Sequence, residues 1–199
     1  IGFLTEVPAA YTRAAKRTID KAVYKILTSN STIYDGKALF HADHGNLITS
    51  GAAPSQTTIQ DIILKAQGQT DPFGEPIYEV PKFLVVPMGY EFVLATIFKS
   101  AQVVGSSNND INPLYNYPLQ VIQSPWINSL SGANAKPWFM VTDPASSKSI
   151  QVDYLNGQET PTFRRSEPAG QLGFVWDIWL DWGITVVDYR GIYKNPGVV

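Results

Sequence analysis

The stretch FVWDIWLDWGITV (Phe174–Val186) places the strongest constraint on the fold. Large apolar residues occupy every second position, whereas Asp177 and Asp181 fall between them. Because side chains alternate between the two faces of a strand, this pattern predicts a strand with one buried face. Fully extended, the run would reach about 40 Å, which is longer than a usual strand. We therefore expect Gly183 to bend it or to divide it into two strands.

A long amphipathic helix is predicted near the start of the chain. Apolar residues recur at spacings of three and four from Tyr11 to Leu27, and Pro8 suits the first helical position. The opposite half of the helix is basic and carries only Asp20 as an acid; its cations are Arg13, Lys16, Arg17, Lys21 and Lys25. Two interpretations are open, a solvated face or a face turned toward a polyanion.

The remaining elements are predicted to be shorter. One helix should run from the N-cap Ser55 to Gln67, stopped by Gly68, and another from Pro87 to Ser100 with Phe92, Val93, Thr96 and Ile97 packed inward. The strand candidates are Ile77–Val80, Phe83–Val86, Leu119–Ile122, Trp138–Val141 and Ile150–Tyr154. Residues 104–113 are expected to form a polar loop. This mixture of helices with largely antiparallel strands indicates an α+β protein.

Composition limits the possible classes of function. Charged residues make up 16% of the 199 residues, against about 25% in typical soluble domains. Either the chain is a domain with a large core, or it is a subunit whose surface is largely covered by interfaces. The net charge of −2 argues against a surface that grips nucleic acid everywhere. The sequence has no cysteine and no apolar run of about 18–20 residues, so we expect no disulfide and no membrane partner.

Motifs for phosphate binding, dinucleotide binding and a serine nucleophile are absent from the sequence. The one group that suggests chemistry is His41, Asp43 and His44, whose side chains are good metal ligands. A metal-dependent hydrolase would need further ligands, such as Asp35 or Asp61. The alternative is a turn whose side chains bond to the nearby backbone. We expect this alternative, and hence no catalytic residue, no metal and no cofactor.

Several phrases occur in a recognisable order between about residues 34 and 197. They include LFHADHGNL (Leu39–Leu47), YEVPKFLVVP (Tyr78–Pro87), YLNGQETP (Tyr154–Pro161) and DYRGIYKNPG (Asp188–Gly197). This ordered series resembles phage major head subunits of the Mu-like type, which are often encoded beside, or fused to, a prohead protease.

The resemblance implies an HK97-type capsid fold with a long spine helix, a peripheral domain and an axial domain. Residues 1–54 would form the spine helix and part of the peripheral domain, residues 55–166 mainly the axial domain, and residues 167–199 the returning peripheral strands. An amino-terminal arm and an extended loop normally precede the spine helix in this family. Neither is visible here, and because the chain starts at Ile1 we expect its original start to lie upstream.

The implied function is that of a structural major capsid protein, not an enzyme, which assembles into an icosahedral shell around double-stranded DNA. Its partners would be copies of itself in pentamers and hexamers, the packaged DNA, and portal, scaffold or protease, and cement proteins. It would assemble in the host cytoplasm and reside in the virion. The alternatives are an encapsulin-like shell around protein cargo, and the metal-dependent hydrolase.

Two groups of residues are candidates for these contacts. The DNA-facing candidates are Arg13, Lys16, Arg17, Lys21 and Lys25. The subunit-interface candidates are Trp126, Trp138, Trp179, Tyr189 and Arg190. By contrast, Trp176 and Trp182 lie on the patterned face of the strand and are expected in the core.

Overall fold

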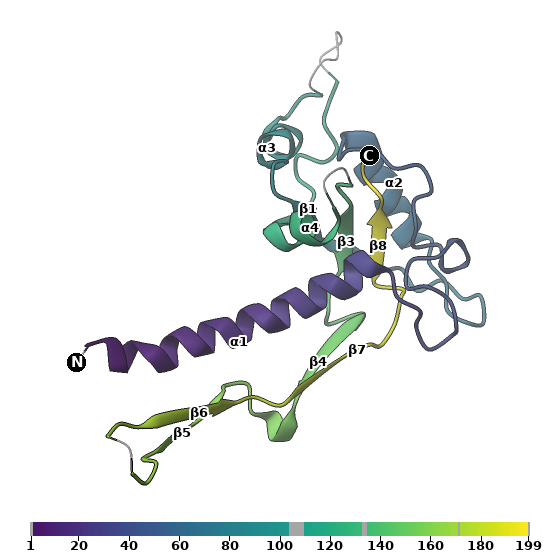
Figure 1. Cartoon of the computed structure of the whole chain (residues 1–199). Coiled ribbons are helices and arrows are strands. Elements are labelled where there is room, and N and C mark those ends of the chain that lie inside the picture. The colour runs from purple at the N-terminus through teal and green to yellow at the C-terminus, as the bar shows by residue number, and fades with distance from the viewer. Residues whose placement is uncertain (1, 104–109, 133–134, 171, 199) are drawn as a thin grey trace. The chain divides into compact units, whose positions relative to one another are not determined.

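The computed structural model describes residues 2–103, 110–132, 135–170 and 172–198 (Figure 1). The chain divides into two compact units. Residues 1–23 and 150–185 form one, here called the ribbon unit, and residues 24–149 and 186–199 form the other, the sheet unit. The predicted loop at 104–113 falls largely on residues 104–109, which lie outside the described residues.

The sheet unit is built on a four-stranded sheet with the order β2-β1-β3-β8. Its strands are β1 (Pro81–Pro87), β2 (Gln120–Ser124), β3 (Trp138–Thr142) and β8 (Ile192–Asn195). The β1–β2 pair is parallel, whereas β3 pairs in antiparallel fashion with both β1 and β8. The strands predicted around Leu119 and Trp138 are therefore confirmed to within two residues.

Helix α2 (Gln56–Gln67) supplies the core beside this sheet, and its prediction is confirmed at both ends. Ser55 caps it through a capping box with Thr58, and Gly68 follows as the C-cap. The four predicted apolar residues are all buried. They belong to a core cluster with residues of β1, β3 and β8 and with two further leucines, the full set being Ile59, Ile62, Ile63, Ala66, Leu84, Val86, Leu94, Leu114, Trp138, Met140 and Tyr193.

Helix α3 (Glu91–Lys99) differs from its prediction. It begins at Glu91 because Pro87 ends β1 and Gly89, with φ +106°, turns the chain between them. Its buried residue is Leu94, whereas Phe92 is 82% exposed. The helix is apolar on most sides, so periodicity alone does not select the face that meets the sheet.

Two further local predictions need correction. Residues 77–80 are not a strand, since Tyr78 takes a left-handed φ of +52° and the strand begins at Pro81. A proline is tolerated there because the first residue of a strand needs no ladder donor. The short helix α4 (Pro125–Leu130), with its proline in the first turn, was not predicted.

The ribbon unit contains the first part of α1 (Gly2–Ser29) and two two-stranded sheets. One sheet pairs β4 (Ile150–Tyr154) with β7 (Trp182–Val186), and the other pairs β5 (Thr162–Ser166) with β6 (Val175–Trp179). Helix α1 extends past its predicted start, and Pro8 lies inside it. At this position a proline removes one N–H donor and crowds the carbonyl of the residue four before it, a cost that falls here within the first turns of the helix.

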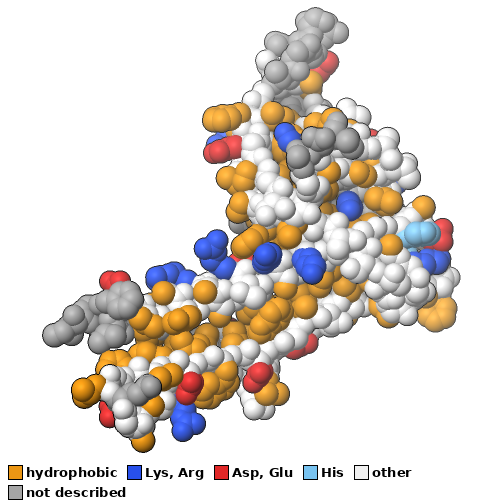
Figure 2. Space-filling model, in the orientation of Figure 1, with side chains coloured by type: hydrophobic (Ala, Val, Ile, Leu, Met, Phe, Trp, Pro, Cys, Tyr) orange, Lys and Arg blue, Asp and Glu red, His pale blue; other side chains and the backbone are white. Residues whose placement is uncertain are grey.

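The alternating run forms β6 and β7, which are divided at Leu180 and Asp181 and not at Gly183. Exposure alternates without a break along it, but the apolar face is only half-buried. The expectation that Trp176 and Trp182 are core residues is therefore wrong for this chain, because a two-stranded ribbon has too little surface to cover its own face. Figure 2 shows hydrophobic side chains gathered on the visible side of this unit.

We predict that Ser55→Ala lowers the free energy of unfolding by about 1 kcal/mol, because the backbone N–H of Thr58 at the start of α2 loses its acceptor, the Ser55 hydroxyl. Urea unfolding followed by circular dichroism measures this change. Thr57→Ala, at an exposed position of the same helix, is the matched control. Equal losses in the two variants would contradict the capping role.

Candidate subunit and nucleic-acid interfaces

The imidazole of His44 is buried and held on both sides. Its Nε2 lies 2.6 Å from Asp35 Oδ2, and its Nδ1 lies 3.1 Å from the carbonyl oxygen of Leu39. A carboxylate and a carbonyl oxygen are both hydrogen-bond acceptors, and which of the two ring nitrogens donates depends on the tautomer of the ring. Both ring nitrogens thus have partners within the chain.

The same ring joins the LFHADHGNL stretch to the carboxyl-terminal segment. It stacks on Tyr189, with ring centroids 3.9 Å apart and planes 10° apart. The guanidinium of Arg190 lies 4.5 Å from the centre of the Tyr189 ring and donates to both carboxylate oxygens of Asp188. Tyr189 and Arg190, predicted as interface residues, are half-buried and make these contacts inside the sheet unit.

The buried amide of Asn46 completes this attachment. It accepts from the backbone N–H of His41 and donates to the carbonyl oxygens of Leu39 and Tyr189. The backbone of Lys194 in β8 then bonds to Asn46 and Ile48 at 2.9 Å each. The stretch is therefore a structural clasp, here called the 39–48 clasp, that adds a short fifth segment beside β8.

The hydrolase hypothesis finds no support in this geometry. His41 Nδ1 accepts from the backbone N–H of Asp43, and the Asp43 carboxylate pairs with Lys37 Nζ at 2.7 Å. No group of three residues of metal-binding type comes together in the described part of the chain. The backbone-bonded turn, the other interpretation offered by the sequence, describes what these residues do.

Hydrogen bonds set the charge state of the two carboxylates in the turn. Partial burial opposes ionisation of Asp35, but bonds from the Lys37 backbone and from His44 outweigh it and lower the pKa of Asp35. The pKa of Asp43 is lowered chiefly by its hydrogen bond from Lys37. Both groups are therefore ionised at neutral pH.

The basic residues of α1 are all exposed (Figure 2). The five cations spread over about half of the helix circumference, and Lys16 at one edge of this spread lies one turn before the buried Ile19. Among the residues that the structure describes, no helix combines the length and apolarity needed to cross a bilayer.

The predicted interface tryptophans differ in their surroundings. Trp138 is fully buried, and its Nε1 donates to the carbonyl oxygen of Ala52 at 2.9 Å. It is a core residue that offers no surface to a neighbour, which corrects its assignment as an interface candidate. Trp126 on α4 is half-buried, and Trp179 on β6 is 47% exposed.

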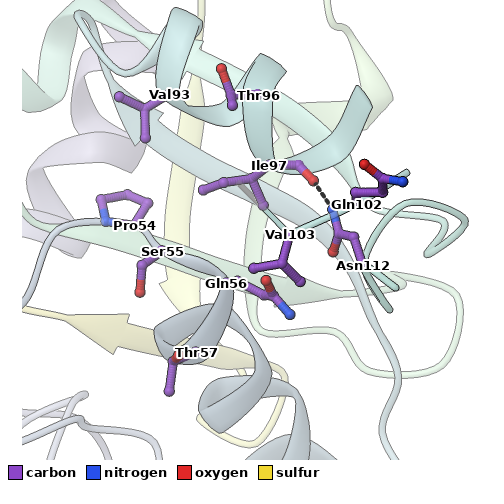
Figure 3. Close-up of a pocket in the computed structure, with 10 residues that line it drawn as sticks. All are labelled: Pro54, Ser55, Gln56, Thr57, Val93, Thr96, Ile97, Gln102, Val103 and Asn112. Carbon is purple, nitrogen blue, oxygen red and sulfur yellow. Dashed lines mark hydrogen bonds between the residues drawn. The ribbon is translucent and has the colours of Figure 1, made fainter. Parts of the chain in front are cut away.

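An apolar groove between α2 and α3 could not be found from the sequence (Figure 3). It has a volume of about 330 Å³ and no charged residue in its lining: Pro54, Ser55, Gln56, Thr57, Val93, Thr96, Ile97, Gln102, Val103 and Asn112. The buried amide of Asn112 holds one wall by donating to the carbonyl oxygens of Ile97 and Ser100. The groove forms only where segments distant in sequence pack together, so no local sequence pattern predicts it.

Comparison with known proteins identifies the class to which this chain belongs. A family model described as "Phage capsid protein" matches residues 1–195, and the chain belongs to that family. A solved chain from Mycobacterium phage Che8 is similar in fold, with a TM-score of 0.50 and 17% sequence identity. The similarity covers 93% of this chain but 61% of that chain, so the present chain spans less than two thirds of the length of its structural relative. No curated protein matches the sequence.

We predict that Asp35→Asn destabilises the fold in a pH-dependent way. Because the pKa of Asp35 is lowered in the folded state, its ionisation contributes stability above the ordinary carboxyl pKa, and this contribution is lost as the pH falls through the lowered value. The difference in unfolding free energy between wild type and variant should be largest above the ordinary carboxyl pKa of about 4 and shrink as the pH falls below it. Chemical unfolding across this range measures it, with Asp61→Asn as control. A difference that does not change with pH would disprove the linkage.

Proposed function

We propose that this chain is a structural, non-enzymatic subunit of a phage head that assembles with copies of itself into an icosahedral shell. Family membership carries this proposal. Two features of the chain support it: the low content of charged residues and the strictly alternating strand face that the chain leaves half-buried. Covering that face with another subunit would remove apolar surface from water.

The finer assignment is of the HK97 type and the Mu-like subtype. In it, α1 serves as the spine helix, residues 1–54 and 167–199 belong to the peripheral domain, and residues 55–166 belong mainly to the axial domain. Subunits would gather in pentamers and hexamers, with portal, scaffold or protease, and cement proteins as further partners. Assembly would take place in the host cytoplasm, and the protein would reside in the virion.

We also propose that the basic face of α1 lies against packaged double-stranded DNA. Exposed lysine and arginine side chains attract phosphate without reading sequence, and salt weakens that attraction. The encapsulin-like alternative would enclose protein cargo in place of DNA. The exposure of all five cations favours the DNA-filled shell.

We predict that the full-length protein forms closed particles. Light scattering and electron microscopy at increasing concentration measure this directly. Nucleic acid that copurifies with the particles would favour the DNA-filled shell, and a defined protein cargo would favour the compartment. A protein that stays monomeric at high concentration would refute the shell proposal.

We predict that Arg17→Glu combined with Lys21→Glu leaves the fold intact but lowers DNA retention in the particles. Loss of two phosphate contacts should reduce the slope of log affinity against log salt by about two. The amount of DNA retained in the particles, determined at a series of salt concentrations, measures this slope. The control is Lys99→Glu combined with Lys136→Glu, an equal charge change at exposed positions outside α1. Equal DNA retention in wild type and in the α1 variant at every salt concentration would refute the proposed contact between α1 and DNA.

A further inference from the structure

An exposed phenylalanine stands at the tip of a tightly bonded turn that follows α2. The turn, here called the tip turn, is closed by the backbone pairing of Thr70 with Pro76, and its Phe73 is 90% exposed. The carboxylate of Asp71 accepts from the backbone N–H groups of Phe73 and Glu75 at 2.8 and 2.9 Å. An aspartate that bonds to the backbone two residues on fixes a turn. The ring is therefore presented on a rigid support, which lowers the entropy cost of binding.

The tip turn is anchored at its base and is acidic. The backbone N–H of Ile77 donates to the carbonyl oxygen of Gln69 at 3.0 Å, and Arg190 Nε donates to that of Thr70 at 3.2 Å. Residues 69–80 contain three acidic residues and no lysine or arginine. The turn thus offers a partner an aromatic ring flanked by carboxylates.

The groove between α2 and α3 has the complementary character (Figure 3). Its volume of about 330 Å³ exceeds the roughly 150 Å³ of an apolar cavity that holds benzene, so a phenyl ring fits within it. Pro54, Val93 and Ile97 supply apolar contacts, and the lining contains no acidic residue. The groove opens at the first turn of α2, where the backbone N–H groups of a helix carry a partial positive charge. A phenyl ring flanked by carboxylates matches both properties.

The tip turn and the groove lie at opposite ends of α2. The groove is lined by residues 54–57 at the start of the helix, whereas the tip turn begins two residues after the C-cap Gly68. A helix of 12 residues is about 18 Å long, and the three residues from Thr70 to Phe73 span at most about 10 Å. Phe73 therefore cannot enter the groove of its own chain, but it can enter the groove of another copy.

We propose that the α2–α3 groove is the docking site for the tip turn of a second copy of this chain, with Phe73 as the inserted side chain. This inference rests on the proposed function, because it assumes that copies assemble. An aromatic side chain that fills a pocket of its neighbour is a common centre of a protein interface. The contact joins two unlike surfaces, so it repeats head to tail and sets the rotation between neighbouring subunits in a ring.

The first test compares the assembly of variants of the full-length protein. Phe73→Ala removes the inserted ring and Thr96→Trp fills the groove, so each should raise the concentration needed for half-maximal assembly about tenfold. The controls, Thr96→Val in the groove and Leu155→Ala at an exposed apolar position of the ribbon unit, should assemble like wild type.

Light scattering measures this assembly, and circular dichroism confirms that each variant is folded. Assembly of Phe73→Ala and Thr96→Trp at the wild-type concentration would overturn the inference while the shell proposal stands. Equal effects of Thr96→Trp and Thr96→Val would also contradict the role of the groove.

The second test keeps an aromatic ring at the tip turn. Phe73 is replaced by the photo-reactive residue p-benzoylphenylalanine, and particles are assembled from a mixture of isotope-labelled and unlabelled chains. Mass spectrometry should find cross-links between differently labelled chains, at peptides that contain residues 54–57 or 93–103. Cross-links confined to one chain, or to other surfaces of the neighbour, would overturn the inference. A wild-type protein that forms no particles would instead overturn the proposed function, and the inference would fail with it.

Discussion

The return of the carboxyl-terminal segment to the central sheet is the constraint on which the rest of the structure depends. Residues 150–185 interrupt the sheet unit in the sequence. Strand β8 therefore pairs with β3 only after the chain has left this unit and returned to it. The 39–48 clasp makes this possible, because Asn46 donates to Tyr189 from a position 143 residues away. Buried amides and carbonyls need partners, so this pairing fixes a single path for the chain.

The clasp joins polar and apolar interactions at one place. The stacked ring of His44 and its hydrogen bond with Asp35 lie on its outer side. On its inner side Phe40 packs against Phe139 with ring centroids 5.6 Å apart, and Lys194 Nζ lies near both rings. Burial in this environment lowers the pKa of Lys194. A sequence phrase that suggests metal chemistry thus serves to hold two distant segments together.

The ribbon unit differs from the sheet unit in how far its apolar residues are covered. Its strands are paired only two by two, and its alternating apolar residues are nowhere fully covered within the chain. The indole N–H of Trp176 is shielded from solvent but has no hydrogen-bond partner among the described residues. Such a surface is typical of a protein whose apolar face is covered by other subunits.

The sequence by itself determined the elements whose signals are local. Helix α2 lies between Ser55 and Gly68 because capping and periodicity agree there, and the alternation along β6 and β7 appears residue by residue in the exposure. Only the tertiary structure decided which face of α3 meets the core, that Trp138 is buried, and that the alternating face stays half-open. These outcomes depend on which surfaces the rest of the chain brings alongside, and no local pattern encodes that. The same holds for the α2–α3 groove, which exists only where segments distant in sequence meet.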